Sequence, residues 1–262
     1  MTKVLLKLGG SVITDRSAEY PKLRTAALTR LAREIAAARV DQLVVVHGAG
    51  SFGHPIVART GIDKGVHDLR GRLAWAETQC WQNVLNVEIA ATLGRAGLPA
   101  LPLQPSALAV LRDGRLRRMD LTTVKGLLRA GMIPVLFGTP AWDEKRGCSI
   151  LSGDVIAPFL AHRLGFDLVI HATDVDGVYD ADPHVDPDAE PFPVVDRKTW
   201  SIVRRALRRS AAIDVTGGML SKAGELVRWA QRGVRGRIID ANAPGRLRDA
   251  LKGKAVGTLV SW

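Results

Sequence analysis

Short apolar runs alternate with longer segments of helical periodicity along nearly the whole chain. The apolar runs cover residues 4–8, 43–46, 100–103, 134–137, 168–171, 236–239 and 258–261. The helical segments cover residues 24–38, 68–93, 121–130, 155–164, 197–209 and 219–232. Such an alternation is typical of a mostly parallel sheet with helices on both faces. The sequence therefore predicts an α/β fold, with hairpin turns at 112–114 and 143–147.

The longest helical segment, 68–93, is rich in apolar residues. One stripe repeats every three or four positions and a second stripe widens it. The stripes consist of Leu73, Ala76, Cys80, Val84, Val87 and Ala91, and of Trp81, Leu85, Ile89 and Leu93. We expect this combined face to be buried, either in the core or against an apolar substrate.

The charge balance is strongly basic. The 262 residues include 37 Lys and Arg against 26 Asp and Glu, a formal net charge of +11. Such an excess fits either nucleic acid or an anionic small substrate. The densest basic cluster, Arg204, Arg205, Arg208 and Arg209, has a helical spacing typical of a solvated face, and no aromatic residue alternates with it. Base stacking is poorly supported, so we expect no nucleic-acid partner.

The cysteine content and the length of the apolar runs indicate in which cellular compartment the protein is expected. The two cysteines, Cys80 and Cys148, lie far apart, which argues against a disulfide framework and against a cysteine-metal site. No apolar run approaches the roughly 20 residues of a membrane span, and glycines interrupt the first run too early for a secretion signal. We expect a cytoplasmic protein, a single domain over 1–262 and no membrane partner.

The stretch VVVHGAGSFGHP places Gly48, Gly50 and Gly53 directly after an apolar run. This G-x-G-x-x-G spacing also occurs in dinucleotide-binding folds, which need an acidic residue at a strand end roughly 20 residues later. The nearest candidate, Asp68, follows no apolar strand. The dinucleotide interpretation is therefore disfavoured, and a loop for another phosphate or a structural turn remains. His54 ends the stretch.

The first apolar run contains Lys7 and ends in Gly9, Gly10 and Ser11. A lysine inside an apolar strand is unfavourable unless it faces a polar site, although it could also extend to the surface. The two glycines let the backbone approach an anion closely and point N–H groups at it. The chain has no G-x-x-x-x-G-K-[ST] motif, so a P-loop enzyme is excluded.

Two further segments complete a set of groups suited to phosphate. Gly217 and Gly218 precede a helical segment in which Lys222 lies about one turn in, beside the positive helix end where phosphates bind. Asp154 lies at the start of another helical segment. Glycine turns, two lysines, an ordered carboxylate and a histidine are together the groups that phosphoryl transfer requires. The acidic, proline-rich segment 180–191 is expected to be a solvated loop rather than a metal site.

In this combination the chain resembles the amino acid kinase superfamily and, within it, the isopentenyl phosphate kinases. The matching segments are KLGGSVITDR, VVHGAGSFGHP, LQPS, ILSGDVIAPFLA, ATDVDGVYD, IDVTGGM and GTLV, in the order of that family. His54 is similar to the histidine shared with the fosfomycin kinase branch. The resemblance implies an open three-layer αβα sandwich, an N-terminal acceptor-substrate lobe (about 1–165), a C-terminal nucleotide lobe (about 166–262) and a homodimer.

The resemblance further implies an activity. It is the ATP-dependent phosphorylation of isopentenyl phosphate, a prenyl monophosphate, to isopentenyl diphosphate, with Mg²⁺. One alternative is a kinase of the same fold that acts on fosfomycin or another small phosphonate or phosphate. An alternative from a different class is a non-catalytic relative that binds a nucleotide or anion.

By the same resemblance, catalytic roles are expected for Lys7, Arg16, His54, Asp154 and Lys222. Lys7 would bridge the phosphates, His54 would bind the acceptor phosphate, and Asp154 would orient both lysines. The expected substrate-binding residues are Gly48, Gly50, Gly53, His54, Ser152 and Gly153. The expected ATP-binding residues are Lys7, Gly9, Gly10, Ser11, Ala49, Thr173, Asp174, Gly177, Gly217, Gly218 and Lys222. No residue is assigned to a metal.

Two positions depart from the family pattern. Arg16 stands where the family often has lysine, so a planar fork replaces a point charge. The segment 137–140, Phe-Gly-Thr-Pro, stands where many members have a His-Gly-Asp-like turn. Both bear on the acceptor side of the site. Apolar walls for a prenyl chain are expected from the 68–93 helix, through Trp75, Cys80, Trp81 and Val84.

Overall fold

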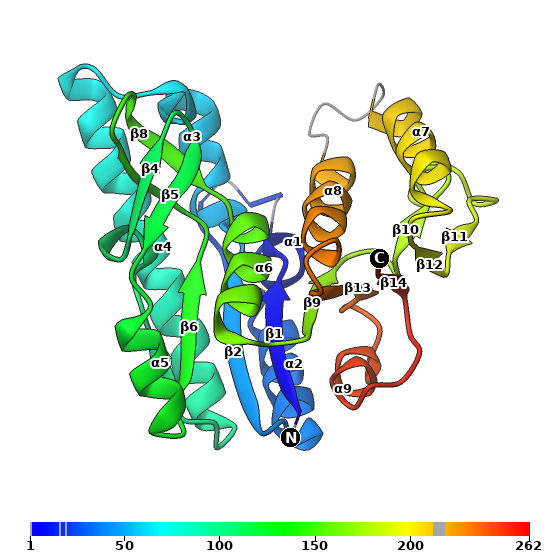
Figure 1. Ribbon diagram of the computed structural model, residues 1–262. Coiled ribbons are helices and arrows are strands. Elements are labelled where there is room, and N and C mark those ends of the chain that lie inside the picture. Colours follow the sequence, from blue (N-terminus) through cyan, green and yellow to red (C-terminus); the bar gives the residue numbers. More distant parts are fainter. Residues whose placement is uncertain (1, 16, 19, 212–217) are drawn as a thin grey trace.

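The computed structural model describes residues 2–15, 17–18, 20–211 and 218–262. Its centre is an eight-stranded sheet in the order β12-β14-β13-β9-β1-β2-β6-β3 (Figure 1). The strands are β1 (Lys3–Leu8), β2 (Gln42–His47), β3 (Ala100–Pro102), β6 (Ile133–Phe137), β9 (Leu168–Thr173), β12 (Val194–Val195), β13 (Arg235–Asp240) and β14 (Thr258–Val260). Only β13 and β14 pair antiparallel among these described strands. The predicted mostly parallel sheet is confirmed.

Helices cover both faces of the sheet. One layer contains α2 (Thr25–Ala38), α4 (Leu69–Arg95) and α9 (Arg246–Leu251). The other contains α5 (Thr122–Arg129), α6 (Gly153–Leu164), α7 (Trp200–Ala211) and α8 (Gly218–Ala230). Side chains alternate between the faces of a strand, so Leu5 packs with the α6 layer and Leu6 with the α2 layer. The expected three-layer αβα sandwich is confirmed.

Two smaller sheets rise above the carboxyl end of β1, on opposite sides in Figure 1. The first joins β4 (Ala109–Arg112), β5 (Arg115–Met119), β7 (Thr139–Asp143) and β8 (Gly147–Leu151). The second pairs β10 (Val178–Tyr179) with β11 (Pro191–Phe192) and frames the acidic segment. Both predicted hairpin turns are confirmed, whereas the strands that flank the second turn had not been predicted.

A buried carboxylate holds the two hairpins together. Both oxygens of Asp143 accept hydrogen bonds, from the Ser149 hydroxyl and from four backbone N–H groups of the two turns. The backbone donors belong to Asp113, Gly114, Lys145 and Arg146. Burial alone would raise the pKa of Asp143, but these N–H groups outweigh it and hold the pKa well below its usual range.

The expected burial of both apolar stripes on α4 is wrong for the first stripe. Leu73, Val84 and Val87 are 62%, 48% and 53% exposed, while the helix buries a face that includes Gln82 and Asn86. Asn86 donates to a backbone carbonyl and contacts a ring nitrogen of His47 across the interface. Polar side chains with such partners can be buried at little cost, so apolar content did not decide which face turned inward. No helix in the described part of the chain is long and apolar enough to cross a membrane.

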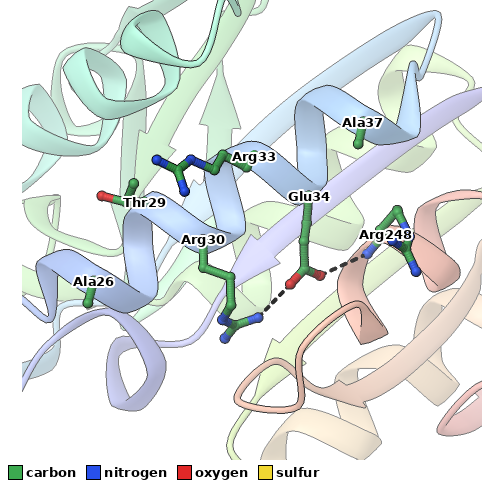
Figure 2. A pocket seen from close by; sticks show the side chains of 7 residues that line it. All are labelled: Ala26, Thr29, Arg30, Arg33, Glu34, Ala37 and Arg248. Atoms are coloured by element: carbon green, nitrogen blue, oxygen red, sulfur yellow. Dashed lines mark hydrogen bonds and ion pairs between the residues drawn. The ribbon is translucent and has the colours of Figure 1, made fainter.

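On the sheet face opposite α6, a shallow groove lies between α2 and α9. Figure 2 shows how Glu34 bridges the two helices from within it. Its carboxylate accepts from the Arg30 guanidinium and from the backbone N–H groups of Gly245 and Arg248. The charge of Glu34 is satisfied by protein donors, so we interpret this groove as a structural joint that fixes the start of α9.

Candidate active site

The predicted phosphate-binding segments meet at one edge of the sheet. Strands β9, β1, β2 and β6 are consecutive neighbours and end at the same edge. The hydrogen bonding between neighbouring strands continues into the loops that follow them. The N–H of Gly9 donates to the carbonyl of Ala172 at 2.7 Å, and the N–H of Gly48 donates to the carbonyl of Leu8 at 2.9 Å. Ligands of parallel α/β sheets bind outside the carboxyl ends of the strands. The geometry therefore fits a ligand site at this edge.

Three charged side chains converge there. Lys7 on β1 is 7% exposed, and its Nζ lies 2.9 Å from Oδ1 of Asp154. Lys222, in the second turn of α8, places its Nζ 3.4 Å from the same oxygen. One carboxylate thus orients two lysines that come from different layers of the fold. The structure thus brings together three of the five residues for which catalytic roles are expected.

Burial and the neighbouring charges together shift the pKa values of Asp154 and Lys222. Burial alone would raise the pKa of Asp154, but Lys7 and Lys222 outweigh it and hold the pKa far below its usual range. Burial and the neighbouring charge of Lys7 lower the pKa of Lys222 to about 8. With both lysines charged and one carboxylate ionised, the cluster carries a net positive charge. It is therefore suited to an anionic ligand.

The start of α6 positions the carboxylate. Ser152 caps the helix by accepting a hydrogen bond from the N–H of Asp154 at 3.1 Å. A serine N-cap and an acidic residue in the first turn both stabilise a helix start. A Cβ at Gly153 would lie 3.3 Å from the carbonyl oxygen of His47, so the helix start packs tightly against the end of β2. Ser152 and Gly153 thus lie beside the start of the second glycine turn.

The two N-terminal glycine turns are in backbone contact with each other. A Cβ at Gly10 would lie 2.4 Å from the N of Gly50, and a Cβ at Gly48 would lie 2.9 Å from the N of Gly10. No other residue type fits at these positions without moving a backbone. The N–H groups of Gly10 and Ser11 open α1 (Gly10–Ile13) and have no partner within the helix, which leaves them available to a phosphate.

His54 is exposed and forms the first residue of α3 (His54–Thr60). The preceding Gly53 packs against α4, since a Cβ there would lie 2.2 Å from Nε2 of Gln82. Ala49 lies between the two glycines that contact the first turn. The end of the second turn, directly before His54, therefore packs against α4.

The residues expected to contact the nucleotide follow β9. Thr173 is buried and its hydroxyl donates to the carboxylate of Asp174 at 2.8 Å. Gly177 has a φ of +127°, and a Cβ there would lie 2.3 Å from Oγ1 of Thr258, so glycine is required. Gly218 is exposed at the first position of α8. Arg16 and Gly217 lie outside the described residues.

One residue beside the charged cluster was missed. His171 on β9 is buried beside Lys7 in the strand register, and its Nδ1 lies 3.3 Å from Oδ1 of Asp154. Burial lowers its pKa to about 3, so the imidazole is neutral. Neither ring nitrogen makes an aligned hydrogen bond to the described residues. The available signal was a histidine at the end of an apolar run, which needs a polar partner when it is buried.

The 137–140 segment links the sheet to α4. Phe137 is buried and stacks on His47 with ring centroids 5.4 Å apart. The Thr139 hydroxyl donates to Oε1 of Gln79 at 2.9 Å. These contacts are made by the segment in which the sequence departs from the family pattern, on the expected acceptor side of the site. In the described part of the chain, no group of three His, Cys, Asp or Glu side chains could hold a metal ion.

Comparison with known proteins gives consistent results. The sequence model of the Amino acid kinase family matches residues 2–240. An isopentenyl phosphate kinase from Methanothermobacter thermautotrophicus is 38% identical, over 98% of this chain and 98% of its own. Another from Methanocaldococcus jannaschii is 32% identical, also over 98% of both chains. A crystallographic isopentenyl phosphate kinase structure superimposes with a TM-score of 0.88, at 34% identity, covering 99% of this chain and 100% of the other.

These likenesses run nearly end to end and include the edge of the sheet where the charged cluster lies. The chain therefore belongs to the amino acid kinase family and, within it, to the isopentenyl phosphate kinases.

Proposed function

We propose that the protein transfers the γ-phosphoryl group of ATP to isopentenyl phosphate and forms isopentenyl diphosphate and ADP. The observation that carries this proposal is the Lys7–Asp154–Lys222 cluster beside two glycine turns that touch through their backbones. One turn suits the donor phosphates and the other suits the acceptor phosphate. The isopentenyl phosphate kinases among the relatives support this acceptor and do not favour fosfomycin.

The acceptor explains why the site needs no strong general base. A phosphate monoester dianion is already a competent nucleophile near neutral pH. The barrier comes from the approach of two anions, which fixed positive groups lower. Lys7 and Lys222 supply such charge at the transferring phosphate, and His54 supplies a hydrogen bond to the acceptor. Asp154 keeps the two lysines in place.

The remaining roles divide between the proposed lobes. In the acceptor lobe (about 1–165), the acceptor phosphate lies against the backbone of Gly48, Gly50, Gly53, Ser152 and Gly153. The donor phosphates lie against Gly9, Gly10, Ser11, Ala49, Gly217 and Gly218. In the nucleotide lobe (about 166–262), Thr173, Asp174 and Gly177 lie along the nucleotide. For Arg16, which lies outside the described residues, the resemblance alone supports a contact with the transferring phosphate.

Magnesium enters this scheme as part of the MgATP substrate. The described residues offer no cluster of metal ligands, and the Asp154 carboxylate is occupied by two lysines. Mg²⁺ commonly keeps several waters and binds to substrate phosphates. The ion therefore needs few ligands from the protein. A reaction that consumes ATP is consistent with a cytoplasmic location.

Apolar contacts for the prenyl chain come from the α4 side of the second turn. Phe52 lies within that turn and packs edge-to-face on Trp81, with ring centroids 6.2 Å apart. Trp81 is 38% exposed, so part of its ring surface is accessible next to the acceptor loop. Trp75, Cys80 and Val84 on the same helix are the other wall residues included in this proposal. A five-carbon chain bound here would point away from the phosphates.

The exposed stripe of α4 supports a homodimer. Leu73, Cys80 and Val87 are spaced by seven residues, the period of paired helices, and all three are exposed. Exposed apolar stripes mark interfaces, and a two-fold contact can set such a stripe against its own copy. Light scattering should give twice the chain mass, reduced to one chain by Val87→Glu. A monomeric wild-type protein would contradict this arrangement.

The activity can be tested by coupled ADP release over a panel of acceptors. The panel contains isopentenyl phosphate, dimethylallyl phosphate, fosfomycin and simple alkyl phosphates, with the product identified by mass spectrometry. Isopentenyl phosphate should be turned over, and Lys7→Ala protein should give the background rate. Robust turnover of fosfomycin alone would make the acceptor wrong but keep the reaction class. A salt-sensitive DNA shift without any kinase activity would favour the nucleic-acid alternative.

A further inference from the structure

Thr14 links the two phosphate turns through one hydroxyl group. The residue is 1% exposed and directly follows α1. Its Oγ1 donates to the carbonyl of Gly10 at 2.7 Å and accepts from the N–H of Ser51 at 3.0 Å. Gly10 belongs to the first turn and Ser51 to the second. The hydroxyl therefore uses its donor on one turn and its acceptor on the other.

The surrounding packing leaves this hydroxyl little freedom. Gly50 has a φ of +50°, and a Cβ there would lie 2.0 Å from Oγ1 of Thr14. The second turn thus folds directly over the threonine. A second contact holds the same turn, since Oγ of Ser51 accepts from the N–H of Lys22 at 3.2 Å. The Thr14 bridge therefore adds to the direct backbone contact between Gly10 and Gly50 in fixing how the two turns lie relative to each other.

We propose that Thr14 is a positioning residue that aligns the donor and acceptor phosphates for transfer. This inference rests on the proposed function, in which the first turn binds ATP phosphates and the second binds the acceptor. Each turn can bind its own phosphate without the bridge. Only the reaction between the phosphates depends on their relative placement, where an error of about 1 Å can cost roughly 100-fold in rate.

The role can be separated from a purely structural one by three variants. Thr14→Val keeps the shape but removes both hydrogen bonds, whereas Thr14→Ser keeps the hydroxyl. Thr92→Val is the matched control, because Thr92 is also buried and also uses its hydroxyl as donor and acceptor, toward Glu88 and Arg95 on α4. Thermal melts of all three should establish the temperature at which each is folded before rates are compared.

We expect Thr14→Val to lower kcat by roughly 10- to 100-fold, with the KM values for ATP and isopentenyl phosphate changed by less than about threefold. Thr14→Ser should restore most of kcat, and Thr92→Val should retain it. If Thr14→Val does not fold, Thr14→Ala, which introduces no new atoms, takes its place. A folded Thr14→Val or Thr14→Ala protein with wild-type kcat, or a loss confined to KM, would overturn the inference. Absence of isopentenyl phosphate turnover in the wild-type protein would instead contradict the proposed function.

Discussion

The Nζ atom of Lys7 lies 2.9 Å from Oδ1 of Asp154, and both side chains are largely buried. Lys7 lies near the end of the first strand, and Asp154 lies in the first turn of α6. A buried lysine is costly unless its charge is paired. Here the pairing is incomplete, because Lys222 shares the same carboxylate. The cluster thus retains a positive charge that approaching phosphates can offset.

Removal of either lysine should slow transfer strongly. We expect Lys7→Ala and Lys222→Ala each to lower kcat by about 10²-fold or more, as for other lost electrostatic groups at a transition state. Folding should survive, since neither side chain packs in the apolar core, and a thermal melt checks this. Lys125→Ala on the exposed face of α5 is the control. Near wild-type turnover in both active-site variants would show that the phosphates bind elsewhere.

The lowered pKa of Lys222 should appear in the pH profile. Below about pH 8 the free enzyme holds the ammonium form, which attracts the ATP phosphates, and above that pH the charge is lost. The kcat/KM for ATP, which reports free-enzyme pKa values, should therefore fall as pH rises past about 8. In Lys222→Arg the guanidinium remains charged, so the alkaline decline should disappear. An unchanged alkaline decline in this variant would assign it to another group.

The sheet could be predicted because its signals are local. Apolar runs that end in glycine, such as those before Gly9 and Gly48, indicate strands that turn at a backbone contact. Lys7 was informative for the same reason, since a lysine in an apolar run needs a polar partner. The family resemblance then identified Asp154 as that polar partner and Lys222 as a second lysine beside it.

Other features depend on contacts between segments that are distant in sequence. No neighbouring residue in the sequence indicates that Thr14 contacts Ser51. Likewise, none indicates that His171 lies beside Asp154. The buried face of α4 was missed because Asn86 finds its partners in β2 and in the segment after β3. Periodicity identifies a helix but does not reveal which polar side chains will be satisfied inside.

The carboxylate of Asp143 should contribute strongly to stability. Asp143→Asn keeps the shape but replaces charge-assisted hydrogen bonds with weaker ones and sets an amide donor against backbone N–H groups. We expect a loss of about 2–3 kcal/mol in the free energy of unfolding, measured by urea denaturation. Asp113→Asn, which disturbs exposed ion pairs with Arg146 and Lys145, should cost less than about 1 kcal/mol.

The pH dependence of that contribution follows from the lowered pKa. An aspartate in the unfolded chain becomes protonated as the pH falls below about 3.9. In the folded protein the pKa of Asp143 is lowered, so its carboxylate stays ionised below that pH. Its stabilisation is thus fully present above about pH 4 and is lost progressively as pH falls further. The difference in stability between wild type and Asp143→Asn should shrink in that acidic range. A difference that stays constant down to pH 2 would mean that the charge of Asp143 is not what stabilises the hairpins.

His54 should act on the acceptor phosphate as a hydrogen-bond donor and not as an obligatory proton acceptor. A phosphomonoester dianion needs no deprotonation, but its negative charge needs a donor as the second anion approaches. His54→Gln keeps a neutral donor of similar reach, whereas His54→Ala removes it. We expect appreciable residual kcat for the glutamine variant. For the alanine variant we expect a loss of about 2–4 kcal/mol in barrier, comparable to deletion of an oxyanion donor.

Nucleotide binding separates this role from the alternatives. His54 opens α3 and is proposed to bind the acceptor phosphate, so the dissociation constant for ATP, measured by calorimetry, should change little in either variant. Equal and complete inactivation of both would instead indicate proton transfer or a need for the imidazolium charge. Loss of ATP binding would place His54 at the donor phosphates and contradict the assignment of the second glycine turn to the acceptor.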